Sequence, residues 1–478
     1  MIEEKSKQRE SAPLNRRQVL SAGLGLAAAS TVAYSSPEPA ANTSRDYDVI
    51  VIGAGFCGVT AARECHRAGH RTLVLEARNR IGGRTFTTQY HGQVAELGGT
   101  WVHWSQPYVW AEINRFGLAL VESSGATPEA DKIIVHTSSG DIVTLSNAKV
   151  GGDISKAMAR YMGDTRTALP RPMEPFSSDA YKKVDGISSL ERLNSIHNMP
   201  RLYRDIVDAY QAAQGHAYTD QFAWLEMVRW YSIPGHNFDD EGDATGRYLL
   251  AQGTSHLLDL MLKEAQVDLL LGVPVTRISQ DSNGVTVIAQ DGREFHAPAL
   301  VSTIPLNVLK DIEWSPKLSE AKFQASTERH AGSGSKAHIV LEGDYGNFTG
   351  YAPGRNPISW LSTQDITAGD THAVAFGPDP ALLDVNDSAS VQKAVRLFLP
   401  DAKVKDCMGY AWDLDPYSKG TWCTLRPGQW SKYLRELQQP QGRVVFASAD
   451  WANGWRGFID GAIEQGLLAG RRVRELLI

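Results

Sequence analysis

A glycine-rich turn, Gly53-x-Gly55-x-x-Gly58, is the part of this sequence with the clearest capacity to bind a ligand. A short apolar run precedes the turn, a helix-type segment follows it, and a second apolar run ends on Glu76. Gly53 permits a tight turn, Gly55 lets the backbone approach a pyrophosphate, and Gly58 allows a helix to pack closely on a strand. The N–H groups at the start of that helix attract phosphate, and Glu76 can accept hydrogen bonds from ribose hydroxyls. The order of these parts predicts a dinucleotide-binding site.

Two more glycine pairs, in residues 77–85 and 96–101, follow Glu76 closely. The first of these segments also carries two or three arginines, whose guanidinium groups are planar donors to phosphate oxygens. A nicotinamide cofactor that binds and leaves needs no such additional contacts, whereas a flavin nucleotide that stays bound does. We therefore predict FAD, with ordinary turns as the alternative interpretation. The residues expected to contact FAD in these segments are Ala77, Arg78, Gly83, Arg84, Gly98, Gly99, Thr100 and Trp101.

The overall composition is that of an ordinary globular protein of 478 residues, with 42% hydrophobic and 21% charged residues. The formal net charge of −6 argues against a nucleic-acid partner, because the nucleic-acid backbone favours basic surfaces. After residue 35 we find no apolar run of about 18 residues, so we expect no stable membrane insertion. The four cysteines are scattered, without the spacing of metal ligands or of a disulfide framework, and we predict no metal site.

The pattern of the N-terminal segment indicates an export signal. Two consecutive arginines, Arg16 and Arg17, precede a soft apolar stretch, residues 19–34, and a Pro/Ser/Ala-rich segment, residues 35–44. This layout is typical of the twin-arginine route, which carries proteins that are already folded and loaded with cofactor. We predict a signal and linker over residues 1–44 and a periplasmic location, and a disordered cytosolic tail is the alternative.

Residues 49–101 resemble the N-terminal flavin module of the flavin monoamine oxidase family, which polyamine oxidases, L-amino-acid oxidases and some desaturases share. The resemblance implies an α/β fold, or α+β when the two domains are classed together. It comprises a Rossmann-like FAD-binding domain and an interleaved substrate domain of sheet plus helices. The strand at residues 272–278 is expected to place Val275 near the adenine end of the cofactor. The expected FAD-binding domain comprises residues 45–105, 248–309 and 422–478, and the expected substrate domain comprises residues 106–247 and 310–421.

A segment near the C-terminus, residues 412–422, resembles the family motif in which a Ser-x-Gly turn leads to a residue beside the flavin. Members with covalently bound flavin carry Cys at that position, and this chain carries Thr421, which cannot form a thioether. The resemblance therefore implies non-covalent FAD, with Trp412 and Thr421 beside it. Cys423, two residues further on, is the alternative position for a covalent link.

The last family motif covers residues 446–462. It implies cofactor contacts from Asp450 and Ile459, although Asp450 stands in place of the usual Glu and is one methylene shorter. A helix at residues 463–477 is expected to point its positive dipole end at the flavin and to stabilise the anionic reduced form.

Three residues are assigned to catalysis on the same resemblance. Trp422 and Phe458 fall at the positions of an aromatic cage, whose rings would hold the amine between apolar walls. Core packing is the alternative interpretation of both. Lys336 follows a Gly/Ser turn and matches the family lysine that holds a water against flavin N5, and a surface lysine is the alternative.

The implied activity is that of an FAD-dependent amine oxidase. Hydride passes from the α-carbon of the neutral amine to flavin N5, and water then hydrolyses the iminium ion to an aldehyde or ketone and a smaller amine. The aromatic-rich run at residues 98–112 resembles exported bacterial enzymes of nicotine catabolism, a likeness that extends over residues 47–478. Nicotine oxidoreductases carry Asn at the position of Phe458, which favours pseudooxynicotine, a secondary methylamine, as the substrate.

Other substrates and roles stay open at this point. Nicotine, another aryl-alkyl amine or a polyamine could be the substrate, although a polyamine site needs acidic residues, which only the acidic loop expected at residues 237–243 could supply. L-Amino-acid oxidation needs an arginine for the carboxylate, and Arg456 fits that role poorly. A desaturase, or an FAD-carrying redox partner without a small substrate, would not need the Trp422 and Phe458 pair. The electron acceptor is O2 or a periplasmic c-type cytochrome, and the chain could form a homodimer.

Overall fold

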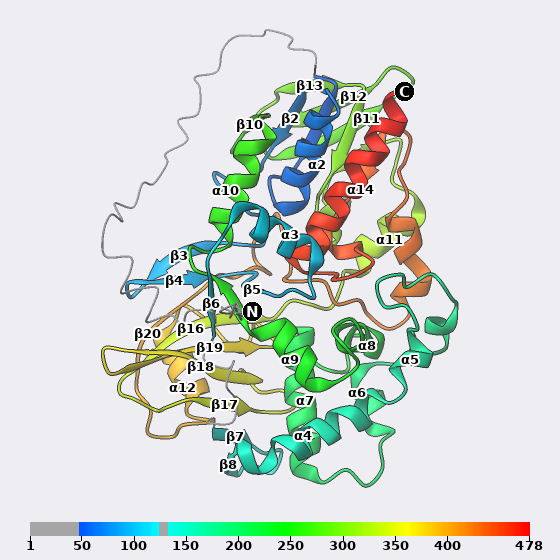
Figure 1. The fold of residues 1–478 in the computed structure, drawn as a ribbon. Helices are drawn as coiled ribbons and strands as arrows, with labels where there is room; N and C mark the ends of the chain where they lie inside the picture. Colours follow the sequence, from blue (N-terminus) through cyan, green and yellow to red (C-terminus); the bar gives the residue numbers. More distant parts are fainter. Residues whose placement is uncertain (1–46, 124–131) are drawn as a thin grey trace, which may run out of the picture.

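The computed structural model describes residues 47–123 and 132–478, and the predicted export signal lies outside these residues. Two bodies are stacked along the long axis of the molecule (Figure 1). The upper body in that view contains the N-terminal strand and the C-terminal helix of the described chain, and the lower body contains most of its middle. Both bodies combine helices with sheets, which confirms the predicted two-domain α/β fold.

A five-stranded parallel sheet forms the core of the upper body. Its strand order is β10 (Asp268–Leu270), β2 (Thr72–Leu75), β1 (Val49–Ile52), β14 (Ala299–Ser302) and β21 (Val444–Phe446). The strands β1, β2 and β14 are largely apolar and buried at every position, as a parallel sheet covered by helices requires. Helix α2 (Phe56–Arg67) packs against α10 (Thr254–Ala265) and α14 (Ile459–Leu477). Three segments that are distant in sequence therefore build one structural unit.

Smaller sheets connect this unit to the rest of the chain. One has the order β13 (Glu294–Ala297), β12 (Val285–Ala289), β11 (Val275–Gln280) and β15 (Glu313–Ser315). Its β12 and β13 pair antiparallel. The others are the pair β3 (Thr87–Tyr90) and β4 (Gln93–Glu96) and the trio β5 (Trp101–Val102), β9 (Tyr248–Leu250) and β6 (Leu120–Glu122). Figure 1 shows β3, β4 and β5 at the junction of the two bodies.

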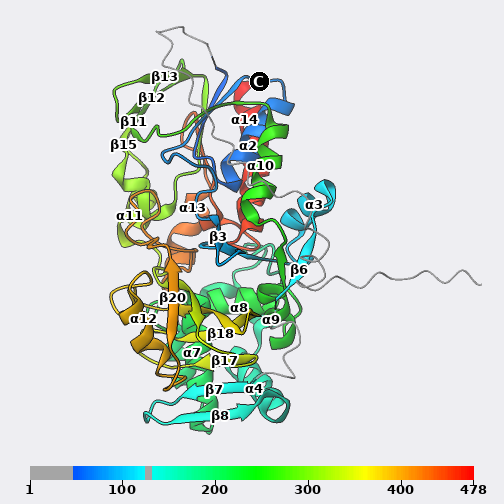
Figure 2. The same ribbon diagram turned by 90° about the vertical axis from the view of Figure 1, so that its left-hand side faces the viewer.

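A seven-stranded sheet and a group of helices form the lower body (Figures 1 and 2). The sheet order is β20 (Val404–Gly409), β16 (Ser335–Leu341), β19 (Asp370–Gly377), β18 (Trp360–Thr367), β17 (Phe348–Tyr351), β7 (Lys132–His136) and β8 (Ile142–Ser146). Every residue of β16 is buried, so this strand can carry Lys336 into the interior. The helices include α4 (Asn147–Met162), α5 (Thr165–Ala168), α6 (Ser189–Asn194), α7 (Arg201–Gly215), α8 (Trp224–Ser232), α9 (Phe238–Gly246) and α12 (Ser388–Val395).

Two predictions of local structure are wrong. The acidic stretch expected to be a loop contains α9, because Asn237 caps the helix by accepting a hydrogen bond from the N–H of Asp240 at 2.8 Å. Acidic residues in the first turn of α9 also suit its positive dipole end. The last helix begins at Ile459 and not at Ile463, so its N-terminus directly follows Phe458.

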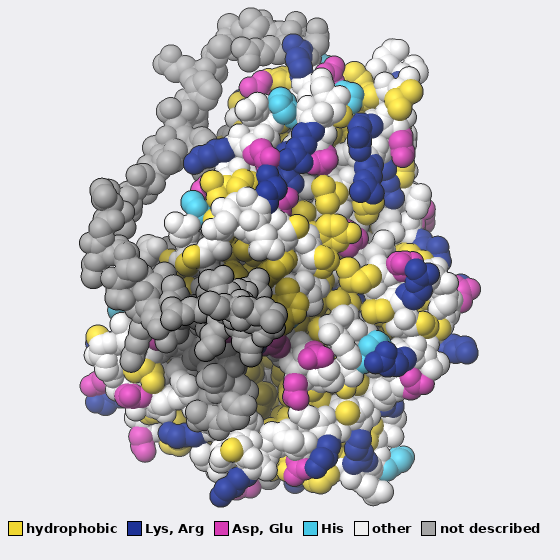
Figure 3. Space-filling model, viewed as in Figure 1, with side chains coloured by type: hydrophobic (Ala, Val, Ile, Leu, Met, Phe, Trp, Pro, Cys, Tyr) yellow, Lys and Arg dark blue, Asp and Glu magenta, His cyan; other side chains and the backbone are white. Residues whose placement is uncertain are grey.

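The surface of the upper body carries paired charges. In Figure 3, basic and acidic side chains lie side by side over the upper part of the visible face. Arg67 and Arg115, the latter on α3 (Pro107–Phe116), both pair with Glu264, at 2.7 and 2.6 Å. This pairing offsets part of the local positive charge. Among the described residues, we find no helix with the length and apolarity that crossing a bilayer requires.

Glu241 on α9 makes the stability of the protein depend on pH. Its side chain is fully buried, and neither carboxylate oxygen has a hydrogen-bond partner among the described residues. Burial raises the pKa of Glu241 from 4.5 to about 8. The folded state binds the proton more tightly than the unfolded state between these values, so the stability contribution of Glu241 falls as pH rises through this window.

We expect Glu241→Gln to raise the melting temperature relative to the wild type by an amount that grows from pH 5 to pH 8.5, because glutamine does not ionise. Thermal unfolding followed by circular dichroism at several pH values measures this difference. Glu174, which is mostly exposed, offers a control through Glu174→Gln. A Glu241→Gln effect that is the same at every pH would contradict the prediction.

Candidate active site

A cavity of about 980 Å³ takes its walls from both bodies. One end is lined by the glycine turn between β1 and α2, and the other by side chains from α7, β16, β18 and β19. A volume of this size lies at the upper end of the range for ligand pockets. It leaves room for a nucleotide cofactor and a small substrate together.

The glycine turn is built for the close approach of a phosphate. Gly53 has a φ of +99°, and a Cβ there would lie 2.4 Å from Thr303 Oγ1. A Cβ at Gly58 would lie 1.9 Å from the carbonyl oxygen of Gly53, so Gly58 packs α2 against the turn. Gly55 precedes α2 and lines the cavity, and the nearest atoms to a Cβ there would be 3.8 Å away. Since no side chain of the described residues caps α2, its first N–H groups are available to an anion.

Glu76 lies at the end of β2 with 3% of its surface exposed, and it lines the cavity. One carboxylate oxygen accepts a hydrogen bond from the N–H of Ala54 at 2.7 Å, and the other from the N–H of Arg78 at 2.9 Å. These contacts hold the carboxylate beside the glycine turn. Each oxygen keeps acceptor capacity for a ribose hydroxyl.

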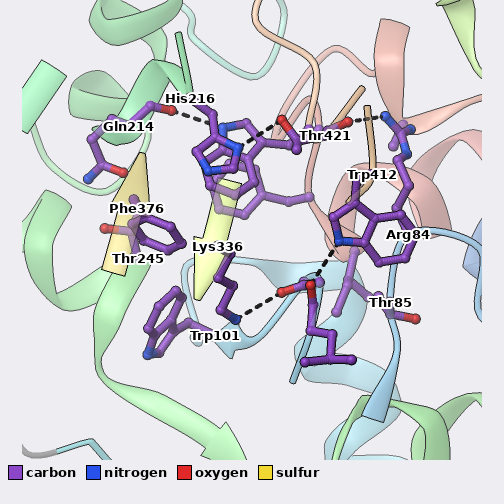
Figure 4. A pocket seen from close by; sticks show the side chains of 18 of the residues that line it. Arg84, Thr85, Trp101, Gln214, His216, Thr245, Lys336, Phe376, Trp412 and Thr421 are labelled. Carbon is purple, nitrogen blue, oxygen red and sulfur yellow. Dashed lines mark hydrogen bonds between the residues drawn. The ribbon is translucent and has the colours of Figure 1, made fainter. Parts of the chain in front are cut away.

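Arg84 links the cavity to the C-terminal motifs. Its Nη1 donates to the carbonyl oxygen of Thr421 at 2.7 Å (Figure 4). Its Nη2 donates to Asp450 Oδ1 at 2.6 Å. Asp450 is fully buried, and its other oxygen accepts a hydrogen bond from the N–H of Leu306 at 2.9 Å. The shorter acid at this position therefore holds Arg84 from behind the cavity wall.

The other two arginines of the second glycine segment have different roles. Arg78 lines the cavity and donates to Asp415 Oδ1 at 2.5 Å and to Ser418 Oγ at 2.8 Å. Arg80 donates to carbonyl oxygens of its own loop and lies over the Phe86 ring at 4.2 Å. Arg80 therefore shapes the loop, whereas Arg78 and Arg84 line the cavity.

Most of the predicted cofactor residues lie on the cavity wall. Besides those described above, they are Ala77, Gly83, Gly98, Gly99, Trp101, Val275, Trp412, Thr421 and Ile459. Three predicted contacts lie behind the wall instead: Gly58, Thr100 and Asp450. Gly58 supports the turn, Thr100 accepts a hydrogen bond from Lys336, and Asp450 holds Arg84.

Lys336 is 3% exposed and lines the cavity, so the alternative of a surface lysine is wrong. Its Nζ donates to the carbonyl oxygens of Glu96 at 2.6 Å and Gly98 at 3.1 Å and also to Thr100 Oγ1. Figure 4 shows the side chain beside Trp101, whose ring centre lies 5.2 Å from Nζ. Burial lowers the pKa of Lys336 to about 7.

Trp422 lines the cavity and is only partly buried. Its indole stacks on His216, with ring centres 4.1 Å apart and planes 14° from parallel, and meets the edge of Phe376 at 5.6 Å. Its Nε1 donates to the carbonyl oxygen of Gln214 at 2.9 Å. These contacts fix one aromatic wall of the cavity.

Phe458 forms a second aromatic part of the wall. It directly precedes α14 and packs edge-on against Trp230 at 4.7 Å and Trp455 at 4.9 Å. Phe458 is also partly exposed. Both residues assigned to the aromatic cage are therefore available to a ligand.

His216, which sequence reasoning missed, supports the Trp422 wall. It ends α7 in the left-handed conformation, with a φ of 49°, and its ring is buried. The network assigns the proton to Nε2, which donates to the carbonyl oxygen of Ser335 at 3.0 Å, while Nδ1 accepts from the Thr421 hydroxyl at 2.9 Å. Burial lowers the pKa of His216 to about 3, so the imidazole is neutral. No motif surrounds His216, so the sequence offered no signal for it.

Two further aromatic residues of the wall were also missed. Trp360 on β18 and Phe376 on β19 stack with ring centres 5.3 Å apart and planes 21° from parallel. Phe376 also meets Trp101 edge-on at 6.0 Å. The strand alternation marks such positions as inward-facing but cannot separate the cavity from the core.

Three buried groups approach one another near Arg84. Ligand atoms of His330, Cys423 and Asp450 all lie within 4.8 Å of one another. Both oxygens of Asp450 are already used, one by the guanidinium of Arg84, which opposes a second cation. Burial raises the pKa of the Cys423 thiol, which favours its protonated form. These groups make a poor metal site.

The wall fits FAD. Because Gly53 and Gly55 carry no Cβ, the backbone of the turn is open to the close approach of a pyrophosphate. The free N–H groups of α2 and the guanidinium of Arg84 supply donors, and the carboxylate of Glu76 supplies the acceptor, that a dinucleotide requires.

Comparison with known protein families gives one match over most of the chain. A family described as flavin containing amine oxidoreductase matches residues 56–474. Among individual proteins, the chain is 42% identical over 437 residues to a pseudooxynicotine dehydrogenase from Pseudomonas sp, covering 90% of this chain and 87% of that protein. It is 36% identical over 459 residues to a nicotine dehydrogenase from Pseudomonas putida, covering 95% and 94%.

Solved structures agree on the fold. Putrescine oxidase in complex with putrescine matches with a TM-score of 0.74 at 20% identity, covering 90% of this chain and 99% of that one. Cyclohexylamine oxidase from Brevibacterium oxydans matches with a TM-score of 0.72 at 19% identity and the same coverage. At this level of identity the likeness concerns the fold alone.

Proposed function

The chain belongs to the flavin-containing amine oxidoreductase family, and on that premise we propose that it oxidises a secondary aryl-alkyl amine, with pseudooxynicotine as the first candidate. Family membership makes the chain an FAD-dependent enzyme that acts on amines. The observation that carries the finer proposal is the aromatic end of the cavity, where Trp422, Phe376 and Phe458 all line the wall. The relative at 42% identity, a pseudooxynicotine dehydrogenase, supports the choice of substrate.

The residues of the chain would bind and orient the reactants. Gly55, Glu76 and Arg84 would hold FAD, which supplies the acceptor for the electrons of the C–H bond next to the amine nitrogen. Trp422 and Phe458 would exclude water and admit the neutral amine, because an unpaired ammonium ion is costly to bury. A free alkylamine has a pKa of roughly 10, so the rate should rise with pH as the neutral form grows.

Anaerobic stopped-flow mixing of the holoenzyme with a panel of amines tests the proposal. The absorbance of oxidised flavin is followed with pseudooxynicotine, nicotine, putrescine and an L-amino acid. We expect the fastest bleaching with pseudooxynicotine. Faster bleaching by another amine would discard this substrate but keep amine oxidation, whereas intact flavin absorbance with a broad range of amines would contradict the proposed chemistry.

Nicotine is the second candidate, because a nicotine dehydrogenase is 36% identical over nearly the full length of both chains. Polyamines are less favoured. Asp239 and Asp243 line the cavity, but Asp243 already pairs with Arg247 and His103, each at 3.0 Å. L-Amino acids are also less favoured, because Arg456 is fully buried against Glu226 and cannot bind a substrate carboxylate.

FAD is proposed to be bound without a covalent link. Thr421 faces the cavity with a hydroxyl that contacts His216, and Cys423 is fully buried outside the cavity wall. We expect acid precipitation of the holoenzyme to release all of its flavin into the supernatant, as measured by absorbance near 450 nm. Flavin that stays with the pellet through washing would contradict this prediction.

Location, electron acceptor and assembly complete the proposal. We propose export by the twin-arginine route to the periplasm, on the basis of Arg16, Arg17 and the apolar stretch after them. Replacing both arginines with lysine should retain the protein in the cytoplasmic fraction.

Either O2 or a c-type cytochrome would accept the electrons. Measuring the rate at which each acceptor reoxidises the reduced flavin would distinguish the two. A homodimer would appear in light scattering at twice the 52.3 kDa mass of the chain.

A further inference from the structure

A buried group of charges lies behind Phe458, outside the cavity wall. It consists of Glu226 and Arg229 on α8 and Arg456 on the loop before α14. We infer that these three residues position the Phe458 ring and thereby set the width of the slot for the substrate nitrogen substituent. The inference rests on the proposed function, because it concerns how the same site selects its amine.

The carboxylate of Glu226 holds both arginines. Its Oε2 accepts a hydrogen bond from Arg229 Nη2 at 2.8 Å, and its Oε1 accepts from Arg456 Nη1 and from the indole N–H of Trp430. The guanidinium of Arg456 also lies over the Trp430 ring at 4.2 Å. Glu226 therefore fixes the position of both guanidinium groups.

The two arginines in turn hold the backbone of the Phe458 loop. Arg229 Nη1 donates to the carbonyl oxygen of Gly454 at 2.6 Å, and its Nη2 donates to that of Arg456 at 3.3 Å. Arg456 Nε donates to the carbonyl oxygen of Ala452 at 3.3 Å. Three carbonyl groups within the five residues 452–456 are thus attached to one charge group, directly before Phe458.

The same helix and the same loop also contact the aromatic rings themselves. Trp230, the residue after Arg229, packs edge-on against Phe458 at 4.7 Å. Gly457 has a φ of +84°, and a Cβ there would lie 3.2 Å from Trp422 Cβ. A shift of the loop would therefore move Phe458 and press on Trp422 at the same time.

Stability alone does not account for this group. All three charged side chains are fully buried, they carry one excess positive charge, and Arg229 Nε and Arg456 Nη2 find no partner among the described residues. Replacing buried ion pairs with apolar residues is often neutral or stabilising. A buried charge group that leaves donors unpaired, and whose three hydrogen bonds to backbone carbonyls all go to one loop, is better explained by the position of that loop.

The test compares Glu226→Gln, Arg229→Lys and Arg229→Met with a matched control, Glu112→Gln. Glu112 is a buried carboxylate that also holds two arginines, Arg63 and Arg115, but none of the three lines the cavity. For each holoenzyme, flavin content and flavin reduction rate are measured with two aryl-alkyl amines, one N-methyl and one N-butyl.

We expect the Glu226 and Arg229 variants to retain FAD. The N-methyl amine should reduce their flavin about 10- to 100-fold more slowly than it reduces the wild-type flavin. The ratio of the flavin reduction rate with the N-butyl amine to that with the N-methyl amine should shift by about fivefold or more. Arg229→Lys should fall between Arg229→Met and the wild type, because one donor to the loop survives. An unchanged rate ratio, or losses equal to those of Glu112→Gln, would overturn the inference. So would a loss of flavin from all three variants, because it would indicate a purely structural role. Wild-type protein that no amine reduces would instead refute the proposed function.

Discussion

Gly58→Ala is expected to yield a protein that retains less than about a tenth of its FAD and the same fraction of its activity. The added methyl group would lie 1.9 Å from the carbonyl oxygen of Gly53, where no side-chain rotation can relieve the overlap. Either α2 must move away from β1 or the turn must open, and both changes displace Gly55 and the first N–H groups of α2. Overpacking at such a site costs about 1–3 kcal/mol or more.

The ratio of flavin to protein absorbance in purified Gly58→Ala measures this loss. Gly186→Ala is the control, because a Cβ at Gly186 has no atom within 4 Å and the residue has an ordinary φ. A Gly58→Ala protein with full FAD content would show that the turn tolerates displacement. FAD binding would then not depend on the close packing of α2 against the turn.

The nucleotide end of the site was predictable because its chemistry is local in sequence. The turn at Gly53, the start of α2 and the carboxylate of Glu76 all lie within one βαβ unit, and backbone geometry dictates the residue types. What the sequence could not show is which residues act behind the wall. Thr100 and Asp450 were predicted as cofactor contacts, and in the structure they lie behind the cavity wall, where they hold Lys336 and Arg84.

The substrate end was predictable only where a family motif marked it. Trp422 and Phe458 were found through their motifs, but His216 and Phe376 were not. These two reach the cavity through the end of α7 and the pairing of β19 with β16, which are contacts between distant parts of the chain. Helical or strand periodicity indicates that such residues face inward, but it does not distinguish a packed core from a cavity.

The acidic stretch before β9 shows a further limit. Its charges favoured a loop, yet a capping Asn237 and the helix dipole stabilise α9 in their presence. The same helix buries Glu241 while Asp239 and Asp243 face the cavity. Composition alone could not separate these environments.

Phe458→Ala is expected to slow flavin reduction by the best amine substrate by about 10- to 100-fold, with FAD content unchanged. The Phe458 ring is partly exposed, lines the cavity and rests on Trp230 and Trp455, so its removal widens the slot and lets water reach the amine. Both effects lower the fraction of bound amine that is neutral and correctly oriented. Anaerobic stopped-flow measurement of the limiting reduction rate and the apparent Kd separates poor orientation from weak binding.

Two further variants make the Phe458 result specific. Phe458→Leu keeps apolar volume but removes the aromatic face. Slow flavin reduction in this variant would support a role for the aromatic ring. Full activity would show that Phe458 only fills space in the cavity wall. Phe176→Ala is the control, because Phe176 is also partly buried against the same core but does not line the cavity. Equal slowing in Phe176→Ala and Phe458→Ala would trace the effect to lost packing. Slowing confined to position 458 would support the aromatic wall as the part of the site that orients the amine.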